Sequence, residues 1–236
     1  STGVLLHGNI RPIEVNGNGD EFLDFPTGHM VNAVNRWKFT NNKGWEGQLG
    51  MRAIDEEKRG GQIDREIGFP YQLGWNTRRY EVWGKSGIVF PNAKYRSAGM
   101  QTKLVHHDYD GFFGNRQYKA NQQSAYVNTL YQSIFGTSTH KFRTGASFQY
   151  DKFTESLDSN QYNREEVVPG AFFEYTFTYF TKFSAVAGVR TDYHNYYGAF
   201  VTSRLHMRYE IKEGSVLRAS AGRGQRTANV IAENIS

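Results

Sequence analysis

Four residues with side-chain oxygens lie close together within residues 14–24. They occupy positions 1, 3, 5 and 9 of a possible calcium loop: Asn16, Asn18, Asp20 and Asp24. Side-chain oxygens two residues apart are the ligands that Ca²⁺ takes from such a loop. However, Glu21 stands where that loop needs glycine, and no glutamate occupies the twelfth position. We therefore favour a turn cluster in which these side chains bind their own backbone, with a calcium site as the alternative.

Other groups of reactive residues do not form a recognisable catalytic site. His106, His107 and Asp108 are consecutive, but adjacent residues of a strand point to opposite faces and cannot easily share one metal ion. No serine lies in a nucleophile-elbow setting. Gly222 and Gly224 follow a strand pattern without a helix after them, so they do not form a phosphate-binding loop. Nothing in the sequence argues for an enzyme.

The composition excludes several classes of protein. Only 38% of the 236 residues are hydrophobic, the mean hydropathy is −0.66, and no apolar run approaches the ~20 residues of a membrane helix. Aromatic residues nevertheless reach 15%, and there are 25 glycines. The net charge is +5, without a basic run that would favour nucleic acid as a partner. Few apolar residues, many of them aromatic, fit a membrane β-barrel with a wet interior.

Alternating polarity predicts antiparallel strands with one apolar and one wet face. Residues 201–210, for example, place Leu205 and Met207 on one face and Arg204 and Arg208 on the other. Tight turns are expected near residues 41–44, 91–94, 136–139, 179–182 and 211–214. Wider connections are expected at residues 55–77, 108–116, 155–164 and 193–198. This alternation of short and long connections is typical of a transmembrane β-barrel with two different rims.

Aromatic residues gather beside the predicted tight turns. We expect them to form a belt at the membrane rim, and its members are Trp37, Phe39, Trp45, Phe90, Phe142, Phe177 and Phe183. The alternative is that these rings cap the core of a soluble β-sandwich, but soluble sheets rarely repeat such a placement at nearly every turn. The membrane interpretation is therefore favoured.

The wet face carries many basic residues, which we expect to point into the barrel lumen. They include Arg36, Arg52, Lys103, Arg143, Arg190, Arg204, Arg208 and Arg218. Burying so many unpaired charges would cost several kcal/mol per ion. The lumen must therefore be wide enough to hydrate them, hold acidic partners for them, or be filled by a polar plug. A small eight-stranded barrel would not suffice.

The stretch 216–230 resembles a signature of TonB-dependent outer-membrane receptors, and its matching positions are Arg218, Gly222, Gly224, Arg226 and Asn229. Residues 35–48 and 169–175 are similar to barrel strands of such receptors from Bacteroidetes. The strand-like segments number about eleven, half of the 22 strands of plugged outer-membrane transporters, so we expect an all-β fold with about 11 of 22 antiparallel transmembrane strands, open as a fragment. The resemblance implies that residues 1–236 are part of one barrel domain, with the plug domain and the C-terminal strands absent.

The resemblance implies a function as well. It suggests part of a receptor in the outer membrane of a Gram-negative bacterium that imports a scarce nutrient such as a metal chelate, a cobalamin or a glycan. The implied partners are membrane lipid, the receptor's own plug, the TonB-ExbB-ExbD complex and the small ligand, with no nucleic acid. The alternative is a non-transport barrel or β-sandwich that acts as an adhesin or surface-binding module.

Overall fold

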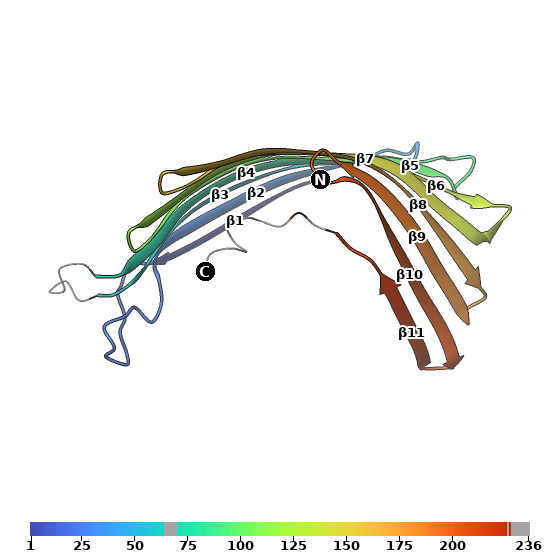
Figure 1. The fold of residues 1–236 in the computed structure, drawn as a ribbon. Coiled ribbons are helices and arrows are strands. Elements are labelled where there is room, and N and C mark those ends of the chain that lie inside the picture. The colour runs from blue at the N-terminus through green and yellow to red at the C-terminus, as the bar shows by residue number, and fades with distance from the viewer. Residues whose placement is uncertain (64–69, 226, 228–236) are drawn as a thin grey trace. The chain divides into compact units, whose positions relative to one another are not determined.

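The computed structural model describes residues 1–63, 70–225 and 227, and its regular structure consists of antiparallel strands (Figure 1). Eleven strands follow one another in a single sheet, in chain order. They are β1 (Thr2–Arg11), β2 (Thr27–Thr40), β3 (Trp45–Gly61), β4 (Gln72–Val89), β5 (Ser97–Phe113), β6 (Arg116–Phe135), β7 (Thr137–Leu157), β8 (Asn160–Tyr179), β9 (Phe183–His194), β10 (Gly198–Lys212) and β11 (Ser215–Gly222). The predicted all-β, eleven-stranded architecture is confirmed. No helix in the described part is long and apolar enough to cross a membrane.

The tight turns lie where the sequence predicts them. One residue connects β6 to β7, two residues connect β10 to β11, and three residues connect β8 to β9. Gly136 alone links β6 and β7 with a φ of 71°, in the left-handed region that favours glycine. The connection between β4 and β5 folds as two successive turns, in which Ala93 N–H donates to Phe90 O and Arg96 N–H to Ala93 O.

The connections at the other strand ends differ from the prediction. Residues 12–26 separate β1 from β2, but residues 114–115, 158–159 and 195–197 are short turns. The connection predicted at residues 55–77 is too wide, because β3 continues to Gly61 and β4 begins at Gln72. The wide connections predicted at 108–116, 155–164 and 193–198 are therefore wrong, because the strands continue almost to the turn. Polar residues stand on both faces of these strand ends, so the alternation that marks a strand is lost there although the backbone ladder persists.

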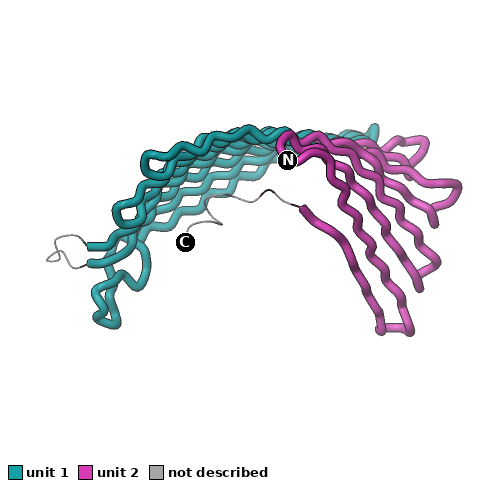
Figure 2. Tube along the Cα trace, viewed as in Figure 1, with its two compact units in different colours: residues 1–88, 99–128, 148–167 teal, residues 89–98, 129–147, 168–236 magenta. Residues whose placement is uncertain are grey.

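The chain divides into two compact units (Figure 2). Unit 1 contains residues 1–88, 99–128 and 148–167. Within it, β2 pairs with β3 from Thr27↔Arg59 to Thr40↔Glu46, and β3 pairs with β4 from Trp45↔Ile88 to Gly61↔Gln72, without a shift in register. Residues that face each other in these ladders share a face of the sheet, so the register alone assigns each side chain to one face.

Unit 2 contains the described residues of 89–98, 129–147 and 168–236. In it, β9 pairs with β8 from Tyr179↔Phe183 to Gly170↔Asp192 and with β10 from Tyr209↔Phe183 to Gly198↔His194. The ladder between β10 and β11 shifts register once, between Glu210 and Lys212. Such an irregularity beside a tight turn bends the strand locally.

The described residues do not enclose a dry core. No large side chain among them is less than 2% exposed. Apolar residues in the middle of strands remain widely accessible, such as Tyr80 at 52% and Leu104 at 59%. A water-soluble protein rarely leaves so much contiguous apolar surface uncovered, so another apolar medium must cover this side of the strands.

Candidate functional site

The strands of unit 1 have an apolar face, which we define by the cross-strand rows of β2, β3 and β4. Its rows are Phe39–Gly47–Ser86, Trp37–Leu49–Gly84, Asn35–Met51–Val82 and Ala33–Ala53–Tyr80. None of these twelve residues is charged. Along β4 they extend from Ser86 to Tyr80, and with Ile88, the partner of Trp45, they span about 26 Å of strand at ~3.3 Å per residue. At the tilt of a barrel strand this length rises about 20 Å, which is most of the ~25 Å apolar band of outer-membrane barrels.

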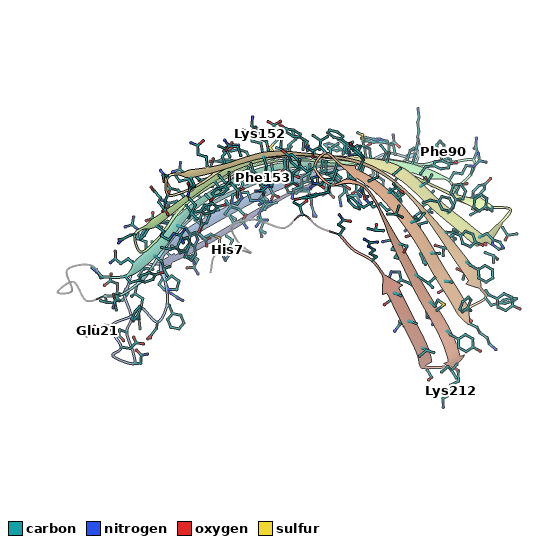
Figure 3. The ribbon with its side chains drawn as sticks, viewed as in Figure 1. His7, Glu21, Phe90, Lys152, Phe153 and Lys212 are labelled. Carbon is teal, nitrogen blue, oxygen red and sulfur yellow. The ribbon has the colours of Figure 1, made fainter. Side chains whose placement is uncertain are left out.

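The opposite side of the same strands is the charged face of unit 1. Its members alternate with those of the apolar face, and neighbouring β7 residues show that adjacent side chains point to opposite sides (Figure 3). Phe153 lies on the charged face under the Arg164 guanidinium, 3.9 Å from the ring centroid, whereas Lys152 forms an ion pair with Glu165 on the other side of the sheet. Adjacent residues of a strand thus meet different surroundings.

In unit 1 the charged face contains carboxylates that are almost fully buried. Glu81 forms ion pairs with Arg79 at 2.6 Å and Lys103 at 3.5 Å. Glu155, only 3% exposed, accepts a 2.7 Å hydrogen bond from the Tyr118 hydroxyl and forms an ion pair with Arg164. A buried carboxylate is tolerated only when cations and hydrogen-bond donors surround it, and both of these are surrounded.

A third buried carboxylate of unit 1, Asp151, is held differently. It accepts hydrogen bonds from Ser124, from Gln122 at 3.3 Å and from Gln149 at 2.6 Å. All three donors are neutral. The network links β6 and β7 by side chains as well as by their backbone ladder, and hydrogen bonds of this kind stabilise the charged form of the carboxylate.

Unit 2 has the same two-sided construction. Its apolar face contains the row Tyr175–Ala187–Leu205, and its charged face contains the row Glu174–Gly188–Arg204. Glu174, 7% exposed, binds Arg204 across Gly188 and lies 3.6 Å from Arg143. Because a Cβ at Gly188 would come within 3.1 Å of Arg204 Nε, the missing side chain leaves room for the guanidinium.

Further ion pairs follow on the charged face of unit 2. Arg190 contacts Asp192 at 2.5 Å and donates to Ser147 Oγ at 2.7 Å. Arg208 contacts Glu210 at 2.8 Å and donates to the Thr181 carbonyl at 2.9 Å. Arg218 lies opposite Arg208 in the ladder, and no carboxylate within the described residues forms an ion pair with it.

The structure thus places the predicted basic residues on the charged face of each unit. Arg36 pairs with Gly50 across β2 and β3. Because Arg52 is two residues after Gly50 on the same strand, Arg36 and Arg52 lie on the same face of the sheet. In the part of the chain that the structure describes, Arg36 has no ion-pair partner, and Arg52 donates to Asn32 Oδ1 at 3.1 Å. That these residues line a lumen and contact a plug or ligand stays a prediction.

The sequence alone did not identify which acidic residues pair with these basic residues. Glu81, Glu155, Glu174 and Asp192 are the most informative of them. Each lies in the same alternating positions as the arginines, so the pattern assigns their face, but only the strand register shows which cation each one meets. Acidic partners, one of the alternatives for balancing these charges, are present on this face.

The predicted rim aromatics lie at the turn ends of the strands. In unit 1, Trp37 and Phe39 are near the end of β2, and Trp45 begins β3 and donates from Nε1 to Ser86 Oγ at 3.0 Å. In unit 2, Phe90 follows β4, and Phe142 stacks on Phe135 with centroids 4.4 Å apart. The same unit brings Phe177 and Phe183 together at 6.2 Å across β8 and β9. A membrane-rim role for these rings stays a prediction.

The possible calcium loop lies in the connection between β1 and β2. Its side-chain oxygens accept hydrogen bonds from the loop's own backbone: Asp24 Oδ2 from Gly17 N–H at 2.7 Å, Asn16 Oδ1 from Gly19 N–H at 2.8 Å, and Asp20 Oδ1 from Phe22 N–H at 2.9 Å. Asn18 joins the cluster by donating to Asp20 at 2.9 Å. These are the local bonds expected of a turn cluster, and calcium binding stays a prediction.

The signature segment is only partly described. Arg218 and Gly222 lie in β11, and Gly224 follows it. Arg226 and Asn229 lie outside the described residues. The model of the family "TonB dependent receptor-like, beta-barrel" matches residues 5–236.

The chain belongs to the TonB-dependent receptor family. No curated protein matches it. The family consists of outer-membrane receptors and transporters rather than enzymes, and the open sheet of this receptor chain, with β1 and β11 at its edges, is consistent with a portion of the family's barrel.

Proposed function

We propose that residues 1–236 form part of the barrel wall of an outer-membrane receptor that imports a scarce nutrient, such as a metal chelate, a cobalamin or a glycan. The observation that carries this proposal is the opposition of two faces on the same strands. Four successive rows of β2, β3 and β4 present twelve uncharged residues on one side. The other side holds paired arginines and carboxylates, which require water or a polar plug rather than lipid.

The charged face supports a contact with a plug inside the barrel. Most of its cations are already neutralised by carboxylates of the same face, as Glu174 does for Arg143 and Arg204. Arg36 and Arg218 have no such partner within the described residues, so they present positive charge to whatever fills the interior. Acidic groups of the receptor's own plug are the complement that these two arginines would bind.

Import against a concentration gradient requires energy. In this proposal the TonB-ExbB-ExbD complex supplies it by acting on the plug, while the wall described here remains a rigid scaffold. The wall's cross-strand ion pairs and continuous ladders suit that role, because they hold its strands together while the plug moves.

Uptake measurements on cells test this function. Cells that produce the full-length receptor, with or without functional TonB, are given labelled ferric chelate, cobalamin or oligosaccharide. We expect one of these compounds to accumulate only when both the receptor and TonB are present. If the receptor binds a compound at the cell surface but none of the three enters in a TonB-dependent manner, the import proposal is wrong and a surface-binding role is favoured.

A further inference from the structure

The apolar side of the strands of unit 1 becomes polar before the strands end. In five of these strands, read away from the tight turns, an apolar residue is followed two positions along by a charged or titratable one. The pairs are Ala53 and Asp55 in β3, Tyr80 and Arg78 in β4, Leu104 and His106 in β5, Tyr150 and Lys152 in β7, and Val167 and Glu165 in β8. This change marks the edge of the hydrocarbon layer on that side of the wall.

The strands continue past this edge, and their outer side carries a pocket of about 550 Å³. Its lining on that side includes Asn76, Arg78, Asp108, Asp110, Lys119 and Asn121. Arg78 is two residues beyond Tyr80, and Asp108 is four beyond Leu104. At ~3.3 Å per residue and a tilt near 45°, the pocket begins about 5 to 10 Å outside the hydrocarbon layer. That is the depth of lipid headgroups.

The pocket holds both charged and neutral hydrogen-bonding groups. Lys119 lies 3.4 Å from Asp110, and Asn121 Nδ2 donates to Asp108 Oδ1 at 2.5 Å. Arg78 lies 3.2 Å from Asp55, and its side chain is 68% exposed. The cations therefore retain donors that a ligand can reach. Exposed ion pairs of this kind contribute only ~0 to 1 kcal/mol each, so a competing anion can replace the carboxylate.

We propose that this pocket binds the phosphorylated, polyhydroxylated headgroup of a glycolipid in the outer leaflet of the outer membrane. Arg78 and Lys119 would contact phosphate, for which guanidinium and ammonium groups are suited. Asn76, Asn121 and the carboxylates of Asp108 and Asp110 would bind sugar hydroxyls, which both donate and accept hydrogen bonds. The proposal depends on the outer-membrane location of the receptor and not on the identity of any imported nutrient.

A protein partner fits this surface less well. The buried centre of a protein interface is rich in apolar and aromatic residues, whereas this pocket's outer lining is built from amides, hydroxyls and charges. The pocket is also continuous with the apolar face along the same strands, as β4 shows between Tyr80 and Arg78. A molecule with an acyl part beside the apolar face and a polar head beside the pocket would cover both.

Native mass spectrometry of the full-length receptor, extracted from the outer membrane in detergent, tests this site. The receptor is incubated with lipopolysaccharide, with the same lipopolysaccharide after phosphatase treatment, or with phosphatidylglycerol. We expect intact lipopolysaccharide to be retained about tenfold more than phosphatidylglycerol, and the dephosphorylated form to an intermediate extent. The double variant Arg78→Gln/Lys119→Gln should lower retention of intact lipopolysaccharide about tenfold, which corresponds to ~1.4 kcal/mol.

Two further variants keep the outcome interpretable. Lys38→Gln/Lys85→Gln removes two cations that share a cross-strand row on the charged face and should leave retention unchanged. Ser156→Trp fills the pocket without altering a charge and should lower retention as the first variant does. Heat-modifiable gel mobility reports that each barrel is folded. Equal retention of all three lipids by the wild-type receptor, or unchanged retention in both folded pocket variants, would overturn the proposal, whatever nutrient the receptor imports.

Discussion

The two faces of the same strands follow different rules. On the apolar face of unit 1, the row Asn35–Met51–Val82 contains no charge, and Met51 and Val82 remain accessible. On the charged face of unit 2, by contrast, Glu174 is almost fully buried between two arginines. The apolar face depends on a covering medium outside the chain, whereas the charged face neutralises itself.

This difference shows why a chain with low hydropathy can belong in a membrane. Only every second residue of each strand meets lipid, so the alternating positions must hold the polar residues that lower the mean hydropathy. In unit 2 the same strand, β10, supplies Arg204 to one face and Leu205 to the other. Substitutions on each face test how far the two faces differ.

A charge on the apolar face should have the largest effect. Met51→Arg places a guanidinium in the middle of the uncharged rows, and we expect it to lower the free energy of unfolding of the full-length receptor in vesicles by about 2 to 4 kcal/mol. Gln48→Glu places a charge on the charged face of the same strand, between Lys38 and Lys85, and should not lower it. Urea unfolding measures both, and equal losses would show that the faces do not differ.

Removing a buried carboxylate should have a smaller effect. Glu174→Gln leaves Arg143 and Arg204 without their shared anion, but both arginines are more than half exposed and water partly replaces it. We expect a loss of about 1 to 2 kcal/mol in the same unfolding experiment. The control is Glu165→Gln, whose partner is the exposed Lys152 and which should cost about 0.5 kcal/mol or less. A loss as large for Glu165→Gln would refute the special role of burial on the charged face.

Adding a methyl group beneath an aromatic ring should destabilise the receptor less than Met51→Arg or Glu174→Gln does. A Cβ at Gly50 would lie 2.2 Å from the Trp83 ring, so the ring would have to move. We expect Gly50→Ala to lower the midpoint of urea unfolding by an amount that corresponds to about 1 kcal/mol. Nothing lies within 4 Å of a Cβ at Gly3, and Gly3→Ala should leave the midpoint within about 0.5 kcal/mol. An unchanged midpoint for Gly50→Ala would mean that Trp83 does not rest on this glycine.

Calcium should have the smallest effect. Because the oxygens of Asn16 and Asp24 already accept backbone hydrogen bonds, we expect millimolar calcium to leave protease cleavage within residues 12–26 of the full-length receptor unchanged. The comparison is the rate of cleavage with calcium and with a chelator. Strong protection by calcium that Asp24→Asn abolishes would instead establish the alternative, a metal site in this loop.

The alternation of polar and apolar residues made the two faces of many strands predictable from the sequence. The two faces of residues 45–55 and 201–210 were predicted from their sequence, and the ladders of β3 and β10 confirm them. The ends of β5 and β6 were not predictable in this way. Beyond the uncharged rows, Asp108 and Asp110 stand on the outer side while His107 and Tyr109 stand on the other, and a strand that is polar on both faces looks like a loop in sequence.

The ion pairs depend on information that no single strand contains. Arg204 and Glu174 are 30 residues apart in the chain and meet across β9 because both lie opposite Gly188. Likewise, the pocket around Arg78 and Lys119 requires the lateral order of several strands. The sequence predicts the face of each residue, whereas the register decides its partner.

Cysteine labelling in the outer membrane tests the central claim most directly, and it suits this chain because residues 1–236 contain no cysteine. Leu205→Cys and His206→Cys occupy adjacent positions on opposite faces of β10. In the full-length receptor, we expect a membrane-impermeant maleimide to label His206→Cys from the wet interior and to leave Leu205→Cys unlabelled, while a lipid-soluble maleimide labels Leu205→Cys. Equal labelling of both cysteines by the impermeant reagent would contradict the two-faced wall.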